Sequence, residues 1–209
     1  MKIKISSVQL RKKVAREAAV LLYASQEKEY KQAKLKAAET LGTRILPSNI
    51  EVAEELDRIA EELEGPSRLK HLIQMREEAL KIMDCLRHYH PRLIGSVWRG
   101  TIHRNSDIDI IVFSSEANLV VNKLKEENFN ITGVERFSII DRGEKEDSLH
   151  IHVVFSSGGK AEIIVRNPEK MKRKEKCEIY GGIKKGLSLT ELQRVLKEDP
   201  LQRFVPEIK

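Results

Sequence analysis

The apolar residues of the first ninety positions recur at the spacing of amphipathic helices. Residues 7–42 carry one apolar stripe, which predicts a long helix with a break near Ser25. Ser48 and Glu51 have capping-box spacing and predict the start of a second helix. A third amphipathic helix is predicted over residues 67–88. This first part of the chain is therefore predicted to be helical, and its pattern indicates packing without a catalytic motif.

Short extended runs replace the helical spacing in the middle of the chain. Strands are predicted over residues 92–97, 107–113, 131–140, 149–155 and 161–165, with a helix over 118–128 and loops over 141–147 and 156–159. The second loop is short enough for an antiparallel hairpin. Near the end of the chain, Ser188 and Glu191 form another capping-box pattern and predict a final helix.

These elements predict a fold class and three segments. The class is α+β, with a small mixed β-sheet, helices on one face of it and a helical N-terminal extension. The segments are residues 1–66 (the helical N-terminal extension), 67–167 (the domain that carries the sheet) and 168–209 (a basic segment and the final helix).

Composition narrows the class of protein and of partner. The 209 residues include 38 lysines and arginines against 32 acidic residues, and the net charge of +6 favours an anionic partner such as RNA or a nucleotide. Cys85 and Cys177 have neither metal-site spacing nor a disulfide framework. The chain shows no signal-peptide run and no apolar stretch of membrane-spanning length, so we expect a soluble cytoplasmic protein without membrane association.

Candidate chemistry is concentrated in the stretch GSVWRGTIHRNSDIDIIVF, residues 95–113. Gly95 permits close backbone approach to an anion, and Ser96 adds a hydroxyl donor. Asp107 and Asp109 alternate with isoleucine in an extended run, which places both carboxylates on one strand face. Paired carboxylates favour a hard cation such as Mg²⁺, and a phosphate-binding turn beside such a site is typical of phosphoryl or nucleotidyl transfer. A polar strand face with two solvated aspartates is the structural alternative, and it leaves the nearby Gly-Ser step unexplained.

This stretch resembles the signature of the nucleotidyltransferase superfamily related to DNA polymerase beta, in which Gly-Ser and a spacer precede Asp-hydrophobic-Asp. The likeness includes Arg99-Gly100-Thr101 in the spacer and Ser106 before the first aspartate, and it extends over residues 80–167. It is greatest to the small prokaryotic members, with some likeness to archaeal CCA-adding enzymes. The resemblance implies transfer of a nucleoside monophosphate from a nucleoside triphosphate to an acceptor hydroxyl, with two Mg²⁺ ions, or Mn²⁺, as cofactor.

The same resemblance implies roles for the residues of the stretch. Gly95 and Ser96 would hold the triphosphate, with a helix directly after the serine that the short polar spacer limits to one or two turns. Asp107 and Asp109 would be catalytic residues and metal ligands. Arg99 is either a further nucleotide-binding residue or a surface arginine, and the sequence leaves both interpretations open.

A third carboxylate completes such a site in the family, on a strand next to the aspartate pair. Glu162 fits this catalytic and metal-binding role, although the family often carries aspartate there, and Glu135 and Asp141 are the substitutes. The alternative for Glu162 is an ordinary outward-facing residue. His150 and His152 share a strand face that the pattern favours as a polar sheet surface, on a strand expected to neighbour that of Glu162.

The acceptor is open at this level, and RNA, a protein and a small molecule are all compatible with the family. The basic run after residue 168 (Lys170, Lys172, Arg173, Lys174, Lys176) is either a steering surface for RNA or a solvated segment. A different class of function is a non-catalytic nucleotide-binding, RNA-binding or antitoxin-like regulatory module that keeps the fold. Base preference and oligomeric state have no signature in the sequence.

Overall fold

The computed structural model describes residues 6–141 and 144–206 and divides into two compact units. A helical unit comprises the chain up to Arg68 with the short segments 102–105 and 176–182, and a sheet unit comprises residues 69–101, 106–175 and the chain from Ile183 onward. Within those described ranges, no helix combines the length and the apolar character that crossing a membrane requires.

The helical unit is built mainly from α1 (Ser7–Tyr23), α2 (Tyr30–Thr40) and α3 (Asn49–Glu64). The predicted long helix is two helices, because the chain turns where Ser25 adopts a left-handed backbone with φ of 55°. The break therefore lies where the sequence predicted it. The predicted capping box begins α3, since the Glu51 amide donates to Ser48 Oγ and the Ser48 amide donates to the Glu51 carboxylate.

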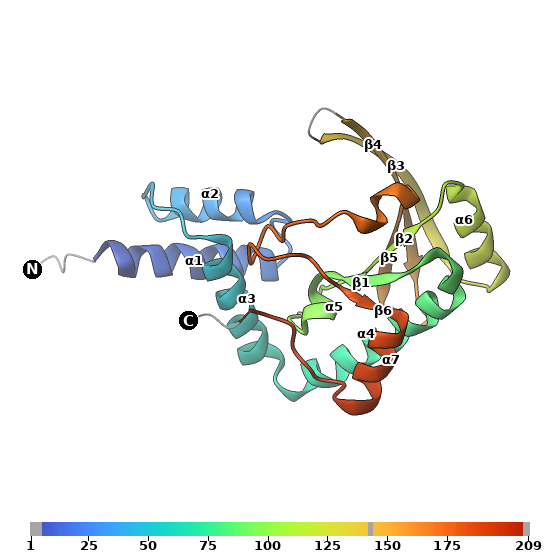
Figure 1. The fold of residues 1–209 in the computed structure, drawn as a ribbon. Coiled ribbons are helices and arrows are strands. Elements are labelled where there is room, and N and C mark those ends of the chain that lie inside the picture. The colour runs from blue at the N-terminus through green and yellow to red at the C-terminus, as the bar shows by residue number, and fades with distance from the viewer. Residues whose placement is uncertain (1–5, 142–143, 207–209) are drawn as a thin grey trace, which may run out of the picture. The chain divides into compact units, whose positions relative to one another are not determined.

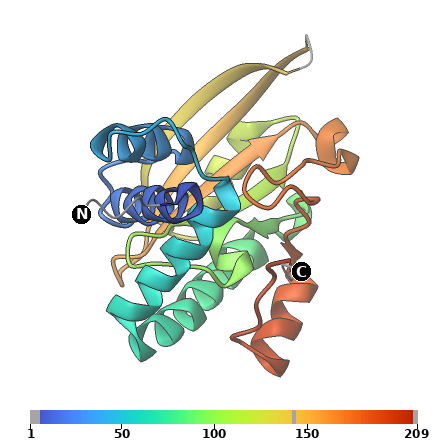
Figure 2. The ribbon, with the colours of Figure 1, turned by 90° about the vertical axis from the view of Figure 1, so that its left-hand side faces the viewer.

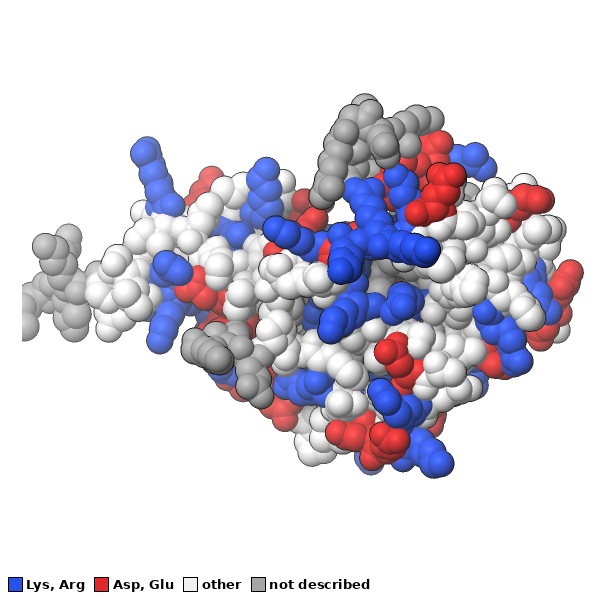
Figure 3. Space-filling model, in the orientation of Figure 1, with Lys and Arg blue, Asp and Glu red and all other residues white. Residues whose placement is uncertain are grey.

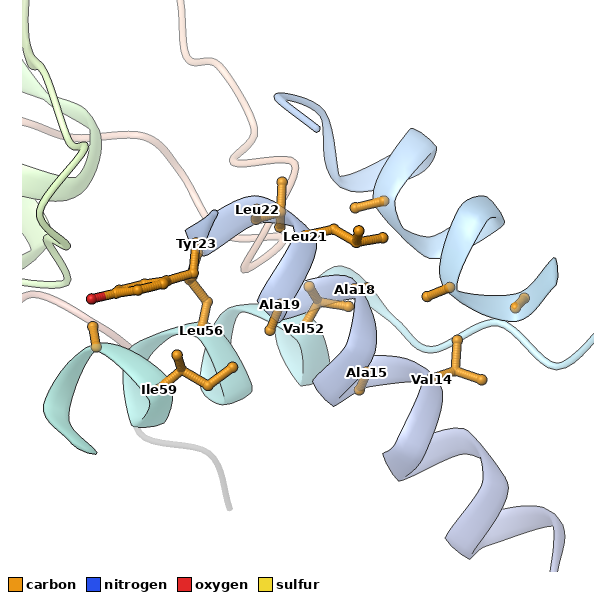
Figure 4. Packing of buried hydrophobic residues seen from close by; sticks show 14 residues of the cluster. Val14, Ala15, Ala18, Ala19, Leu21, Leu22, Tyr23, Val52, Leu56 and Ile59 are labelled. Carbon is orange, nitrogen blue, oxygen red and sulfur yellow. The ribbon is translucent and has the colours of Figure 1, made fainter. Parts of the chain in front are cut away.

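Small side chains dominate the core of the helical unit. Ala18, Ala33 and Ala37 are fully buried beside the larger Val14 and Val52. Figure 4 shows Val14, Ala18 and Val52 directed between the helices. Alanine combines the highest helix propensity with the smallest side chain that can pack, so α1 can approach both neighbouring helices closely. The core of this unit thus explains the alanine-rich stripes of its sequence.

The sheet unit contains a mixed sheet whose described strands lie in the order β3-β4-β5-β2-β1-β6 (Figure 1). Their bounds are β1 (Arg92–Ile94), β2 (Ile108–Phe113), β3 (Ile131–Asp141), β4 (Glu144–Val154), β5 (Lys160–Arg166) and β6 (Leu187–Ser188). β2 and β5 are parallel, and the other neighbouring pairs are antiparallel. The helical elements around this sheet are α4 (Pro66–Cys85), η1 (Arg87–Tyr89), α5 (Gly95–Arg99), α6 (Ala117–Glu126), η2 (Pro168–Lys172) and α7 (Leu189–Glu198). The predicted α+β class with a small mixed sheet is confirmed.

Two strand predictions differ from the structure. The strand predicted over residues 92–97 ends at Ile94, because Gly95 already begins α5. The loop predicted over 141–147 is mostly strand, since β3 reaches Asp141 and β4 begins at Glu144, while residues 142–143 lie outside the described residues. Figures 1 and 2 show this long hairpin extending away from the rest of the sheet. Its outer part is rich in charged residues, which hides the apolar alternation from which strands are predicted.

The two faces of the sheet differ in polarity. Along β2, Ile108, Ile110 and Val112 are fully buried, whereas Asp109 and Phe113 are only partly so. The apolar face supplies the core of the unit together with buried residues of α4 and α6. We call the opposite face, which carries Asp109, the site face.

Candidate functional site

The turn after β1 places the Gly-Ser step against an acidic side chain. Gly95 has φ of +70°, in the left-handed region, and begins the five-residue helix α5. A Cβ atom at this position would lie 2.0 Å from Asp109 Oδ2, so a residue larger than glycine does not fit. The predicted helix is present and is as short as the spacer indicated, but it begins at Gly95 and so includes the Gly-Ser step.

Three carboxylates lie together on the site face or at its edge. Asp107 immediately precedes β2 and is exposed, and Asp109 is the second residue of that strand. Glu162 lies in β5, where its Cα is the register partner of the Asp109 Cα. Paired residues of adjacent strands project from the same face and are about 4.8 Å apart. The structure therefore brings Glu162 beside Asp109, although the two residues are distant in the sequence.

The environment of Asp109 is unfavourable to an isolated negative charge. Its pKa is raised to about 7, chiefly because the carboxyl is buried, and further because Glu162 and Asp107 are negative, while Lys184 lowers it. The raised pKa shows that these carboxylates share one local field. A cation beside them would remove the repulsion and stabilise the ionised forms.

The donor set fits a hard divalent cation by its chemistry. Carboxylate oxygens are the ligands that Mg²⁺ and Mn²⁺ prefer, and the β2–β5 register supplies them from adjacent strands. Across the described ranges, no group of three or more His, Cys, Asp or Glu side chains is arranged to hold a metal ion. Glu162 Oε1 also pairs with His150, whose Nδ1 lies 2.7 Å away.

Gly95→Ala should damage this site more than it damages the fold. A left-handed alanine costs about 1–2 kcal/mol, and the added Cβ would displace the Asp109 carboxylate. We expect Mn²⁺ affinity, measured by titration calorimetry, to fall at least about tenfold. Gly158→Ala is the matched control, because Gly158 has φ of +89° and a Cβ there would meet no atom within 4 Å. Equal Mn²⁺ affinity in the two variants would contradict the packing of Gly95 on Asp109.

Arg99 is part of the turn and is not a surface arginine. It is only 6% exposed, its guanidinium carbon lies 4.4 Å from the centroid of the Trp98 ring, and its Nη1 donates to the Gly95 carbonyl at 3.4 Å. Trp98 is also buried, so it packs under the turn. Arg99 is thus held at the base of the Gly-Ser turn, close to where the sequence predicted a phosphate contact.

A cationic cavity of about 560 Å³ lies along β1 and β2 on the site face. Its floor includes Ile94, the register partner of Asp109, and Ile111, the next residue of β2 on that face. Basic residues that line it include Arg92, Lys170, Lys172, Lys174, Lys184 and Arg194. Figure 3 shows Lys and Arg side chains gathered near the middle of the face that it presents. The combination of a positive wall and an apolar floor suits a nucleotide or another phosphate-bearing ligand.

The cavity contains a lysine that the sequence analysis did not single out. Lys184 precedes β6, which pairs with β1, and Gly186 packs so tightly there that a Cβ would lie 2.6 Å from the Leu93 carbonyl oxygen. Burial lowers the pKa of the Lys184 ammonium, while the charges of Glu175 and Asp109 oppose that effect. The sequence contains little indication of Lys184, because the two residues of β6 are too few to form a recognisable strand pattern.

The remaining candidates occupy different places on the sheet. Glu135 lies in β3 opposite His150, so β4 separates it from Glu162, and the Asp141 side chain is outside the described residues. His150 and His152 lie in β4, the neighbour of β5, as the sequence predicted. Most of the predicted basic run lines the cationic cavity.

A comparison with protein families identifies the segment that contains the Gly-Ser turn and the carboxylates. Residues 89–180 match the family model of the nucleotidyltransferase domain, and this range contains the Gly-Ser turn and the three carboxylates. Residues 89–180 are a nucleotidyltransferase domain. The predicted superfamily is therefore confirmed, for a segment that covers less than half of the chain. No curated protein matches the chain in sequence.

Solved structures resemble the chain only in part. A crystal structure of the Cid1 poly(U) polymerase is 20% identical, with a TM-score of 0.32, over 46% of this chain and 30% of that one. A cytoplasmic RNA terminal U-transferase is 18% identical, with a TM-score of 0.35, over 55% and 35% of the two chains. Cid1 in complex with the UTP analogue UMPNPP is 17% identical, with a TM-score of 0.33, over 56% and 37%. The region that resembles this protein thus spans about a third of these longer chains.

Proposed function

We propose that this protein is a divalent-metal-dependent nucleotidyltransferase that moves a nucleoside monophosphate from a nucleoside triphosphate to an acceptor hydroxyl. The observation that supports it most is the β2–β5 register, which sets Glu162 beside Asp109 next to the Gly95 turn. In-line displacement at a phosphate requires charge neutralisation on the attacking and leaving oxygens, and shared carboxylates hold the ions that supply it. The nucleotidyltransferase domain gives the same reaction class.

Each residue of the site has a role in this proposal. Asp107, Asp109 and Glu162 would hold Mg²⁺ or Mn²⁺, which when bound neutralises charge on the reacting oxygens. One of the three carboxylates would accept the proton of the acceptor hydroxyl. The amides near Gly95 and the Ser96 hydroxyl would bind the triphosphate as a backbone anion nest.

The acceptor that we propose is the hydroxyl end of an RNA strand. The cationic cavity is lined by Ile94, the register partner of Asp109. Lys172 and Lys174, which line it at the end of η2 and just beyond, are exposed. A row of basic side chains beside a catalytic centre binds a repeating phosphate backbone through release of condensed cations. The net charge of +6 is consistent with such a partner.

Transfer of labelled nucleotide tests the activity and the acceptor together. With Mg²⁺ and each labelled nucleoside triphosphate in turn, we expect label on RNA ending in a 3′ hydroxyl and none on the same RNA ending in a 3′ phosphate. Replacing Lys172 and Lys174 with Gln should reduce the slope of log RNA affinity against log salt by about 1.4, at about 0.7 for each phosphate that is no longer neutralised. Lys197→Gln, on the exposed side of α7 and outside the cavity, is the matched control.

The outcomes separate the activity from the acceptor. Label on protein or on a small molecule, with none on RNA, would leave the enzyme proposal standing and remove RNA as the acceptor. If no acceptor is labelled, and Asp107→Ala binds nucleotide as the wild type does, the enzyme proposal is wrong. A non-catalytic binding module with the same fold would then be the better account.

A further inference from the structure

His150 is held in one orientation against Glu162. Its Nδ1 lies 2.7 Å from Glu162 Oε1, and its Nε2 lies 3.0 Å from Ser148 Oγ. The Phe137 ring packs against the imidazole edge, with 4.4 Å between the ring centroids and 61° between the planes. The imidazole is therefore fixed by contacts from β3, β4 and β5, and its side chain is only 19% exposed.

The hydrogen bonds also define which nitrogen donates. An ionised carboxylate can only accept, so Nδ1 must carry the proton that faces Glu162. Ser148 has a rotatable hydroxyl, which can donate to Nε2 of a neutral imidazole or accept from a charged one. Nδ1 can therefore donate to Glu162 whichever role the Ser148 hydroxyl takes.

The pairing matters because Glu162 is longer than the aspartate that the family often carries. Glutamate has one more rotatable bond than aspartate, so its carboxylate samples more positions and loses more entropy when it binds an ion. A bond from His150 to Oε1 holds the side chain near Asp109 and leaves Oε2 for a second partner. Hydrogen bonds to ligating carboxylates of this kind orient the ligand and tune its affinity.

We propose that His150 is a positioning residue that orients Glu162 as the third carboxylate of the cation site. The inference rests on the proposed function, since it assigns Glu162 to metal binding. It adds a residue outside the Gly-Ser and Asp-x-Asp stretch, and it accounts for glutamate at this position. Ser148 and Phe137 are the next contacts outward and keep the imidazole in place.

His152 provides a matched control on the same strand and face. Its Cα is the register partner of Glu162, so it lies nearer to Glu162 in the sheet than His150, whose register partner is Ile164. In the part of the chain that the structure describes, no hydrogen bond joins the His152 side chain to Glu162. Replacing His152 should therefore leave the orientation of Glu162 unchanged.

The test compares His150→Phe, His150→Asn and His152→Phe in the full chain by Mn²⁺ titration, with calorimetry or electron paramagnetic resonance as the readout. We expect His150→Phe to weaken Mn²⁺ binding by about 10- to 100-fold and to raise the Mg²⁺ concentration for half-maximal transfer by a similar factor. His150→Asn should recover most of the affinity, because an asparagine amide donates from nearly the position of Nδ1. His152→Phe should bind Mn²⁺ as the wild type does.

A double-mutant comparison shows whether His150 acts through Glu162. In a Glu162→Ala background, His150→Phe should cause no further loss of Mn²⁺ affinity. The inference would be wrong if His150→Phe lowered Mn²⁺ affinity as much in the Glu162→Ala background as in the wild type, or if His150→Phe alone kept wild-type Mn²⁺ affinity. Neither result would contradict the proposed nucleotidyltransferase activity. The inference would also be wrong if His150→Asn bound Mn²⁺ as weakly as His150→Phe while both variants kept the thermal unfolding of the wild type. Absence of both Mn²⁺ binding and nucleotide transfer in the wild type would overturn the proposed function and the inference together.

Discussion

Asp109→Asn should reduce nucleotidyl transfer by at least about 10³-fold, which corresponds to about 4 kcal/mol of lost transition-state stabilisation. The amide keeps the shape of the carboxylate but removes the charge that holds a divalent cation. The same substitution should stabilise the metal-free protein by about 1–3 kcal/mol. It removes a buried negative charge that Glu162 and Asp107 repel, as the raised pKa of Asp109 indicates.

Single-turnover transfer assays and urea unfolding in chelator measure the two effects. Asp107→Asn is the matched control: it also removes a proposed ligand, but Asp107 is exposed, so its substitution should lower activity and stabilise the metal-free fold less than Asp109→Asn does. If Asp109→Asn keeps more than a tenth of the wild-type activity, Asp109 does not hold the cation. If it lowers the stability of the metal-free protein, the carboxylates do not repel one another as described.

Arg76→Met should lower the free energy of unfolding by at least about 3 kcal/mol, because each buried polar group left without a partner costs about 1–3 kcal/mol and Arg76 serves several of them. Arg76 is completely buried in α4, and its guanidinium donates to four backbone carbonyls. These belong to Val97, Trp98, Pro200 and Gln202, at distances of 2.7–3.2 Å. Burial lowers the pKa of Arg76 to about 10, so the group is charged at neutral pH and the carbonyl oxygens compensate for its lost hydration.

The Arg76 variant should also weaken nucleotide binding, because two of its four partners belong to α5, the helix that follows the Gly-Ser turn. Urea unfolding and nucleotide titration measure these effects. Arg76→Lys should be intermediate, since an ammonium retains the charge but cannot reach four carbonyls. Arg87→Met, which removes an exposed pair with Asp84, should change stability by less than about 1 kcal/mol. If Arg76→Met lowers the free energy of unfolding by less than about 1 kcal/mol, the four carbonyls find other hydrogen-bond donors.

Local patterns in the sequence predicted the elements whose structure depends on near neighbours. The break near Ser25 and the capping boxes at Ser48 and Ser188 form where they were expected, because their hydrogen bonds join residues three or four positions apart. The outer part of the β3–β4 hairpin was predicted as a loop. Its strands are stabilised by cross-strand pairing that the charged side chains of that stretch conceal.

The sequence by itself determined the kind of chemistry that this protein can support. Gly95, Ser96, Asp107 and Asp109 lie within one short stretch, and glycine backbone freedom and strand alternation dictate what those residue types do. The same residues pointed to the nucleotidyltransferase superfamily, and Glu162 was placed through that resemblance. The net charge also favoured a phosphate-bearing partner. It could be read from the sequence because it is a sum over residues and does not depend on the fold.

Only the tertiary structure decided how that chemistry is completed. The pairing of Glu162 with Asp109 depends on the parallel register of β2 and β5, and the bond from His150 depends on β4 lying beside β5. Lys184 reaches the cavity because β6 returns to pair with β1, and Arg76 binds carbonyls from two distant segments. These contacts join residues far apart in the chain. Their formation depends on which surfaces the whole fold buries together, and no local pattern encodes that.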